Sequence, residues 1–419
     1  MFDYVREVQD LIASGYTFKG KVYKFTVRFY ILDAVGRQFM KCITTHGGYA
    51  GCEKCEVWGE SYRNRIIYLD LDASARTDDS FRLRTQPRHH KGDSPLEACD
   101  TLMVSQFPLD PMHLLWGGCS KRLLEFWLFE IGVWKLHYVV IGLISDVFVF
   151  LRPYCPNDFN RKPQSLKYFK SFKCTELRRI VLYDGILAFK DFVDDNIYRH
   201  FLLLHCSSYI MSSKTLFAAH RETVVEMLKS FISHSAVIYG REFVVYCVHS
   251  LIHLPNECDG GFTLDDLTAF KYENRLKSIK ESLRSGLHSL QQLVRRDEKT
   301  SGVVNLASKP SHVAVSLKHK ILGEVVDGQQ YRRLKAGSLM LRVGKANGCF
   351  KTKDGSILVL QNFVCKQRKL YLVGCKFRCL EDFYEYPLPS SELGIFRVSL
   401  TQLHSHSRLD GLLMRKKNV

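Results

Sequence analysis

The sequence predicts an α/β region at the N-terminus, a long all-α segment in the middle and a small β-domain at the end. Residues 22–32 are rich in β-branched and aromatic types and lose their alternation at the end, which is typical of a buried strand. From about residue 119 to 297, apolar residues recur three and four positions apart, which predicts helices. After Thr300 the pattern alternates and includes two Asp-Gly pairs, which predict strands joined by hairpins.

Composition restricts the protein to the globular class. The 419 residues are 46% hydrophobic and 12% aromatic, so a disordered or collagenous chain is excluded. The longest apolar run, 138–151, contains Asp146 and is shorter than the roughly 20 residues of a membrane helix. No secretion signal is recognisable, so we expect the 14 cysteines to be core thiols or metal ligands in a reducing compartment.

The charge is strongly positive and unevenly distributed. The formal net charge is +17, and residues 301–419 carry 20 Lys and Arg against 8 Asp and Glu. This balance favours a polyanionic partner such as DNA, although a solvated basic face without a ligand explains it as well. The candidate nucleic-acid contacts are the basic residues Arg275, Lys277, Lys280, Lys366, Arg368 and Lys369.

Two shorter predictions concern the N-terminal region. Apolar residues at helical spacing predict a helix over 2–13, which Gly15 ends. The segment 41–110 is irregular and rich in Gly, Cys, His and charge, with a short strand expected at 65–71.

The sharpest local signal for chemistry is a group of potential metal ligands within fourteen residues, with three glycines between them. Thiolates and an imidazole suit tetrahedral zinc, and glycine lets the backbone wrap around an ion. The alternative is unligated thiols beside a surface histidine. Ligands from outside the segment, such as His89, His90 or His113, are also open. The predicted ligands are Cys42, His46, Cys52 and Cys55.

A second constellation is acidic. Asp33 follows the predicted strand, Asp110 stands close to His113, and Glu273 lies at the start of a predicted helix. Carboxylates brought together in this way could hold the paired divalent ions of phosphoryl transfer. Spacing alone favours a structural interpretation, in which the two aspartates cap turns or helices and the glutamate stabilises a helix start.

A third signal is a pair of histidines, His249 and His253, which lie four residues apart and thus on one helix face. They could share a metal, but no acidic residue accompanies them as in HExxH. Histidines in a core or interface are the favoured interpretation.

Aromatic and basic residues alternate along the predicted strand: Tyr23, Phe25, Arg28 and Tyr30. This face could stack nucleic-acid bases. A strand that is simply buried explains the pattern as well.

Several blocks follow one another in an order that resembles transposase-derived proteins of the CACTA type, over roughly residues 1–300. They read ILDAVGRQFMKCITTHGGYAGCEKC, RTDDSFR, HHKGDSPLE, FPLDPMHLLWGG, RKPQSLKYFKSFKCTELRRIVLYDG, VHSLIHL and AFKYENRLKSIK. The resemblance implies an RNase H-like core of the DDE class, interrupted by a helical insertion before its last catalytic acid.

The resemblance also implies roles for individual residues. Asp33 matches the second catalytic Asp of the family and Glu273 the catalytic Glu. Cys52 and Cys55 match the CxxC of the family. Its DxxH motif is matched by Asp110 and His113.

Two departures from the family bear on activity. The first catalytic Asp of the family belongs to an opening strand ahead of the helix with which this chain begins, so we expect an N-terminally truncated, incomplete core. Such a start fits a truncated gene model, a decayed element or a domesticated protein. The Asp-Ala-Pro-Ala-Arg of the family reads Asp33-Ala34-Val35-Gly36-Arg37, and the loss of Pro loosens the turn that aims the carboxylate.

The expected organisation is a partial RNase H-like core with a zinc-binding insert (1–118), a helical insertion (119–264), a closing helix with the candidate glutamate (265–300) and a basic β-rich domain (301–419). The expected function is DNA binding in the nucleus without strand cleavage, with structural Zn²⁺, no membrane contact and a possible homo-oligomer. The alternatives are a fragment of an active transposase, which would use Mg²⁺ or Mn²⁺, and a protein-interaction scaffold.

Overall fold

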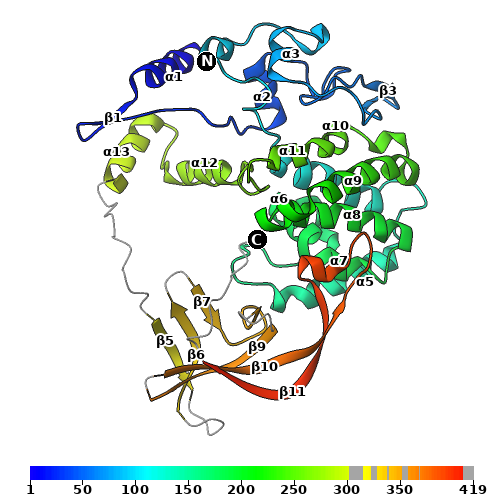
Figure 1. Ribbon diagram of the computed structural model, residues 1–419, viewed down its shortest axis with the longest axis vertical. Coiled ribbons are helices and arrows are strands. Elements are labelled where there is room, and N and C mark those ends of the chain that lie inside the picture. The colour runs from blue at the N-terminus through cyan, green and yellow to red at the C-terminus, as the bar shows by residue number, and fades with distance from the viewer. Residues whose placement is uncertain (302–314, 322–327, 337–338, 352–356, 368, 409–419) are drawn as a thin grey trace. The chain divides into compact units, whose positions relative to one another are not determined.

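The computed structural model describes residues 1–301, 315–321, 328–336, 339–351, 357–367 and 369–408, and divides into two compact units (Figure 1). The first unit comprises residues 1–144 and 166–273, and the second comprises 145–165 and 274–419. Most of the predicted helical insertion thus belongs to the same unit as the N-terminal region, whereas its residues 145–165 belong to the second unit. The fold is mixed, with helices prevailing in the first unit and one curled antiparallel sheet in the second.

The N-terminal region contains short elements joined by long irregular segments. The predicted first helix is confirmed, and it ends where Gly15 takes a φ of 75°. The elements in chain order are α1 (Phe2–Ser14), β1 (Tyr16–Phe18), β2 (Lys21–Tyr23), α2 (Ala34–Lys41), β3 (Glu60–Tyr62), β4 (Arg65–Ile67), α3 (Asp78–Arg82), η1 (Pro87–His89) and η2 (Pro95–Cys99).

The strand predicted over 22–32 is wrong for most of its length. Residues 21–23 form β2, which pairs with β1, and residues 24–33 form neither helix nor strand. A strand needs a neighbour that bonds its backbone along its length. Here the neighbour is a loop, in which the Gln106 carbonyl accepts from Tyr30 N at 2.8 Å and the Gln106 side chain donates to Val27 O at 2.7 Å.

Only two-stranded sheets, β1–β2 and β3–β4, occur among the described residues of the first unit. The central sheet of an RNase H-like core is therefore not formed by them. This agrees with a segment 24–33 that lacks a strand beside it, and the RNase H-like relationship stays a prediction.

The predicted helical segment is helical almost throughout. Its elements are η3 (Met112–Ser120), α4 (Lys121–Leu128), α5 (Tyr138–Leu151), η4 (Arg152–Tyr154), η5 (Leu166–Ser171), α6 (Cys174–Arg179), η6 (Ile180–Asp184), α7 (Gly185–Phe189), α8 (Asp195–Met211), α9 (Lys214–Tyr239), η7 (Arg241–Phe243), α10 (Tyr246–His249), η8 (Ser250–His253), α11 (Leu254–Cys258), α12 (Phe270–Ser282) and α13 (Ser289–Ser301). Of these, η3 and η6 are π-helical turns.

Aromatic side chains fill the helical core of the first unit. Trp127 is fully buried, packs edge-on against Phe189 and donates from Nε1 to the Tyr239 hydroxyl at 3.1 Å. Burying a large ring while bonding its polar atom avoids the cost of an unsatisfied donor. This core holds the short segment α10–η8 that carries the histidine pair.

The second unit contains the predicted β-domain, which is confirmed as an antiparallel sheet. Its strands run in the order β11-β10-β9-β6-β5, with β7 beside β6 and β8 beside β9. Leucines and Phe363 form its core. Asp327 and the Asp354-Gly355 pair lie outside the described residues. The strands are β5 (Val315–Ile321), β6 (Gln329–Ala336), β7 (Leu339–Arg342), β8 (Cys349–Lys351), β9 (Ile357–Lys366), β10 (Lys369–Asp382) and β11 (Phe396–Arg408), with η9 (Ser390–Leu393) before β11.

Candidate metal centre

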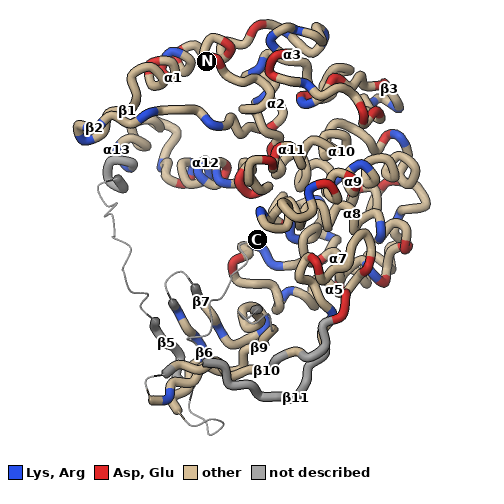
Figure 2. The backbone as a smooth tube through the Cα atoms, viewed as in Figure 1, with Lys and Arg blue, Asp and Glu red and all other residues tan. Residues whose placement is uncertain are grey.

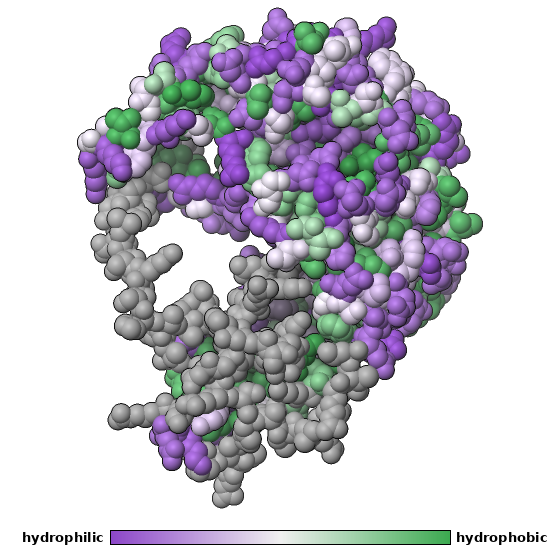
Figure 3. All heavy atoms as spheres, in the orientation of Figure 1, coloured by the Kyte–Doolittle hydropathy of each residue, from purple (hydrophilic) through white to green (hydrophobic). Residues whose placement is uncertain are grey.

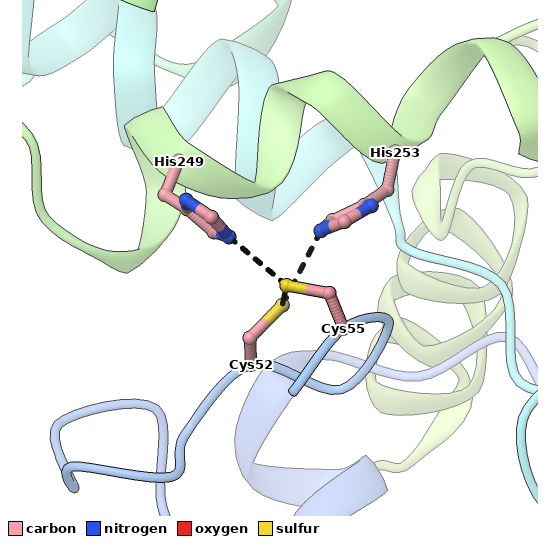
Figure 4. Close-up of side chains that lie close together, drawn as sticks. All are labelled: Cys52, Cys55, His249 and His253. Atoms are coloured by element: carbon pink, nitrogen blue, oxygen red, sulfur yellow. Dashed lines mark hydrogen bonds between the residues drawn. The ribbon is translucent and has the colours of Figure 1, made fainter. Parts of the chain in front are cut away.

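Four side chains from two distant parts of the first unit meet at one point (Figure 4). Cys52 and Cys55 lie on the loop between α2 and β3, His249 ends α10 and His253 ends η8. Their ligand atoms all lie within 4.8 Å of one another. Among the described residues, this is the one group of Cys, His and acidic side chains compact enough to hold an ion.

The distances suit a tetrahedral metal. Cys55 Sγ lies 3.4 Å from Cys52 Sγ and 3.3 Å from His249 Nε2, and Cys52 Sγ lies 3.4 Å from His253 Nε2. Ligand atoms bound to zinc at about 2.0–2.3 Å lie about 3.3–3.8 Å from one another. Two thiolates and two imidazoles are a zinc donor set, so the residues present fit this ion.

The electrostatics of the pair favour a thiolate. Burial alone would raise the pKa of the Cys52 thiol, but the hydrogen bond from Cys55 and the two imidazoles hold that pKa well below its ordinary value. The pKa of Cys55 is raised, because its thiol donates to Cys52. A thiolate is the form of cysteine that binds a metal.

Hydrogen bonds within the protein hold the loop that carries Cys52 and Cys55 in its shape. Arg76 donates to the carbonyls of Cys52 and Cys55 at 3.4 and 3.0 Å, and the Tyr68 hydroxyl donates to the Gly48 carbonyl at 2.6 Å. A Cβ at Gly51 would lie 2.5 Å from the Tyr68 hydroxyl, so this close approach requires glycine. Both cysteine ligands are buried, and so is His249.

Two predicted ligands do not belong to this group. Cys42 caps α2 with a φ of 52°, and its Sγ lies 3.8 Å from Phe39 O. His46 bonds Gln38 at 3.0 Å through Nδ1. The remaining ligand positions are taken by His249 and His253, for which a core or interface role was the favoured prediction.

The three other histidines that could have supplied ligands also lie outside this group. His89 bonds the Ala50 carbonyl at 2.8 Å, and His90 packs against the Phe81 ring. His113 is bonded to Asp110. The HxxxH spacing of His249 and His253 was the sequence signal that could have pointed to this pair.

Between the two cysteines, Glu53 belongs to a buried ionic network that the sequence did not indicate. Its carboxylate accepts from Arg37 at 3.0 Å, from Lys41 at 3.3 Å and from the Tyr246 hydroxyl at 3.0 Å. Burial alone would raise the pKa of Glu53, but these cations outweigh burial and lower it to about 2. Arg37 also donates to the carbonyl of Leu32, which precedes Asp33. The network therefore joins the metal loop to the start of α2.

The predicted acids gather at a second place in the first unit, around His113. Asp110 is buried and accepts from His113 Nδ1 at 2.5 Å, and Glu273 Oε1 lies 3.6 Å from His113 Nε2. The hydrogen bond to Asp110 raises the pKa of His113, and the charges of Glu273 and Asp33 add to this effect. Residues that are far apart in the sequence are thus brought together.

The three acids do not share a compact ligand geometry. Asp33 is exposed and caps α2 by accepting from Gly36 N at 2.6 Å. Both oxygens of Asp110 are engaged, with Met112 N, His113 and Ala269 N as donors. The capping interpretation is confirmed for Asp33, and Asp110 accepts from the first backbone N–H groups of η3.

A cavity of about 580 Å³ opens beside these acids. It is lined by Ala34, Arg37, His46, Gly47, Ser61, Asn64, Arg65, Ile66, Asp110, His113, Leu114, Val245, Tyr246 and Cys247. It lies between the acidic group and the β3–β4 hairpin.

Comparison with known proteins gives one match. The family model DUF8592, described as a domain of unknown function, matches residues 318–410, which include most of the β-sheet. No curated protein and no solved structure matches the chain. Over its described residues, the structure has no helix with the length and apolar character that crossing a membrane requires.

Proposed function

We propose that the chain is a transposase-derived protein that binds DNA in the nucleus, holds a structural zinc ion and does not cut DNA by itself. The observation that carries the proposal is the meeting of Asp33, Asp110 and Glu273 around His113. The resemblance assigns these residues to one site, although the sequence separates them widely. Their proximity supports that assignment.

The role proposed for zinc is structural. Cys52, Cys55, His249 and His253 would supply all four ligands of a tetrahedral ion, which would leave no position for water or substrate. A bound ion would join the loop after α2 to the segment α10–η8, which are almost 200 residues apart in sequence. Its chemistry there is to fix these two segments together.

The geometry of the acids supports binding without cleavage. Phosphoryl transfer with two metal ions needs several carboxylates with free oxygens that share the ions. Both carboxylate oxygens of Asp110 accept hydrogen bonds, and one oxygen of Asp33 accepts the bond that caps α2. Glu273 and the remaining oxygen of Asp33 are too few to hold such a pair.

Basic residues of α12 and of β9 support DNA as the partner, and Figure 2 shows the blue of Lys and Arg along α12. Arg275, Lys277, Lys280 and Lys366 are exposed, and Lys277 Nζ lies 3.7 Å from Glu281 on the same helix. Such an exposed ion pair is weak enough for a phosphate to replace. Arg368 and the side chain of Lys369 lie outside the described residues.

The test is binding of the full chain to a labelled 20-base-pair duplex at several salt concentrations. We expect affinity to fall steeply with salt, and the slope to decrease by about 3 when Arg275, Lys277 and Lys280 are all changed to Gln. Lys214→Gln is the matched control. Lys214 is likewise exposed and lies in a weak ion pair, with Asp266, but it belongs to α9.

Cleavage is tested in the same preparation with supercoiled DNA and Mg²⁺ or Mn²⁺. We expect no nicking. Metal-dependent nicking that Asp33→Asn abolishes would contradict the proposal, and so would duplex binding that does not depend on salt.

A further inference from the structure

The β1–β2 hairpin presents one face made of rings and a cation. Lys19 and Gly20 have φ values of 50° and 75°, as in the two-residue turns that close tight hairpins. Tyr16 pairs with Tyr23 across the strands, and Phe18 pairs with Lys21. Paired residues point to the same face, and so do residues two apart on one strand. The face therefore carries three aromatic rings and one lysine.

This face is open to solvent. The exposed fractions are 54% for Tyr16, 51% for Phe18 and 46% for Tyr23, and every strand residue of the hairpin is exposed. The rings of Tyr16 and Phe18 lie 6.5 Å apart with planes inclined by only 13°. Figure 3 shows hydrophobic and hydrophilic side chains next to one another on the surface over this hairpin. Exposed rings grouped on one face mark a surface for a partner.

The charged residues next to the rings in the sequence are all positive. No Asp or Glu occurs from residue 11 to 32, while Lys19, Lys21 and Lys24 lie within this range. Lys19 Nζ lies 5.5 Å from the centroid of the Phe18 ring, and Lys21 Nζ lies 5.3 Å from that of Tyr23. None of the ion pairs between described side chains includes these lysines.

The β3–β4 hairpin shows what a hairpin of the same size looks like when its charges are satisfied. Its turn also has two residues of positive φ, Arg63 and Asn64. There, however, Arg63 pairs with Glu242, and Arg241 pairs with Glu60. In the β1–β2 hairpin, Lys19 and Lys21 instead lie over aromatic rings, and the ion pairs between described side chains include neither, so both cations can meet an anion.

We propose that the β1–β2 hairpin binds an unpaired nucleic-acid strand. The bases stack on the rings of Tyr16, Phe18 and Tyr23, and the lysines contact the phosphates. Stacking needs the open face of a base, which a duplex hides, and it tolerates any base because each has a π face. An apolar protein partner would cover the rings but leave three lysines without an anion, so charge selects the polyanion.

The inference rests on the proposed nucleic-acid binding but concerns another surface and another ligand. The duplex assay above tests α12, whereas the hairpin is tested with single strands. Binding of single strands without duplex binding would refute the proposed function and leave this inference standing. Binding of the duplex without binding of single strands would refute this inference and leave the proposed function standing.

The experiment is fluorescence anisotropy of the full chain with labelled dT20, U20 and a 20-base-pair duplex. Changing Tyr16, Phe18 and Tyr23 to Thr keeps residues that favour strands and removes the rings. We expect this variant to bind dT20 and U20 at least about tenfold more weakly. Its binding to the duplex should change less than twofold. A preference between dT20 and U20 tells whether DNA or RNA is the strand.

The lysines are tested separately, with Lys19→Asn, Lys21→Gln and Lys24→Gln combined. Asn is used at position 19 because it tolerates the positive φ there. We expect the salt slope for dT20 to decrease by about 2.

The matched control changes the other hairpin, with Tyr62→Thr and Arg63→Asn, and should leave dT20 binding within twofold. Circular dichroism and thermal melting establish that each variant is folded. The inference is overturned if the wild-type chain does not bind single strands, if the ring variant binds them as well as wild type, or if the control loses as much affinity. It is also overturned if light scattering shows that the rings hold two copies of the chain together and that their loss leaves dT20 binding unchanged.

Discussion

The first unit contains two groups of side chains of the types that bind metals. The two groups differ in burial, in the spacing of their ligand atoms and in the hydrogen bonds that occupy those atoms. The Cys52, Cys55, His249 and His253 group is largely buried, and its ligand atoms lie within 4.8 Å of one another. The acidic group around His113 is more open, with Glu273 57% exposed and Asp33 exposed as well. Asp110, its buried member, is fully engaged in hydrogen bonds. The first group is ready for an ion, whereas the second serves local structure.

The difference teaches that converging acids are not by themselves a catalytic site. A carboxylate that caps a helix or ties two segments together has little freedom to share an ion. A buried thiolate and thiol that face two imidazoles form a donor set suited to a metal. The geometry therefore favours the Cys and His group over the acids as the place where this unit could hold a metal.

The largest effect should follow removal of the metal. A structural zinc contributes many kcal/mol to folding, so we expect a chelator, or Cys52→Ser, to lower the free energy of unfolding by about 5 kcal/mol or more. In a protein of this size the melting temperature should fall by about 5 °C or more. Thermal denaturation with and without chelator measures this, with Cys42→Ser as the control that should melt like wild type. An unchanged melting temperature in chelator would refute a structural metal.

The next largest effect concerns Glu53, which joins the loop of Cys52 and Cys55 to α2 through Arg37 and Lys41. Glu53→Gln leaves two buried cations without their anion, so we expect a loss of about 3–5 kcal/mol in urea denaturation. Glu60→Gln removes a glutamate from an exposed pair with Arg241 and should cost about 1 kcal/mol or less. Equal losses for the two variants would show that the Glu53 network does not stabilise the unit.

A smaller effect is expected from pH at the acidic group. The pKa of His113 in the folded protein is raised by Asp110, so the protonated form is favoured by folding. This stabilisation is complete below the unfolded pKa of about 6.5 and is lost as pH rises through the folded pKa. His113 is 42% exposed, so solvent limits the effect to about 1 kcal/mol or less.

Urea denaturation of wild type and His113→Asn between pH 6 and 9 measures the contribution of His113 to the free energy of unfolding. The advantage of the wild type should be greatest at pH 6 and shrink toward pH 9. An advantage that grows with pH would contradict the assigned hydrogen bond.

The smallest effects should come from the two acids assigned to catalysis by the resemblance. Asp33→Asn keeps a side chain that caps α2, and Glu273→Gln changes an exposed residue, so each should shift stability by less than about 0.5 kcal/mol. Asp33→Ala removes the cap and should cost about 1 kcal/mol. A loss for Asp33→Asn as large as that for Asp33→Ala would mean that its charge, and not its cap, matters.

Sequence reasoning identified half of the candidate metal centre. The CxxC spacing pointed to Cys52 and Cys55, because a three-residue step on a loop brings two thiols together. Cys42 and His46 were chosen as partners for their closeness in sequence. The histidines that the structure places beside them, His249 and His253, come from a helical segment that only tertiary packing brings to the loop.

The fold was predicted unevenly for a similar reason. Helices of 119–297 follow from periodicity, which is a local signal. The strand expected over 22–32 had the right residues, but strand formation depends on a neighbour that local sequence does not specify. The exposed hairpin at its start was missed, since Tyr23 looked like part of a buried strand.

The most direct test of the account is the metal content of the purified full chain, measured by elemental mass spectrometry in wild type and in single variants. We predict about one zinc per chain in wild type, in Cys42→Ser and in His46→Gln, and loss of that zinc in Cys52→Ser, Cys55→Ser, His249→Gln and His253→Gln. A wild-type chain without bound metal would contradict the account. Metal that persists in His249→Gln and His253→Gln but is lost in Cys42→Ser and His46→Gln would contradict it equally.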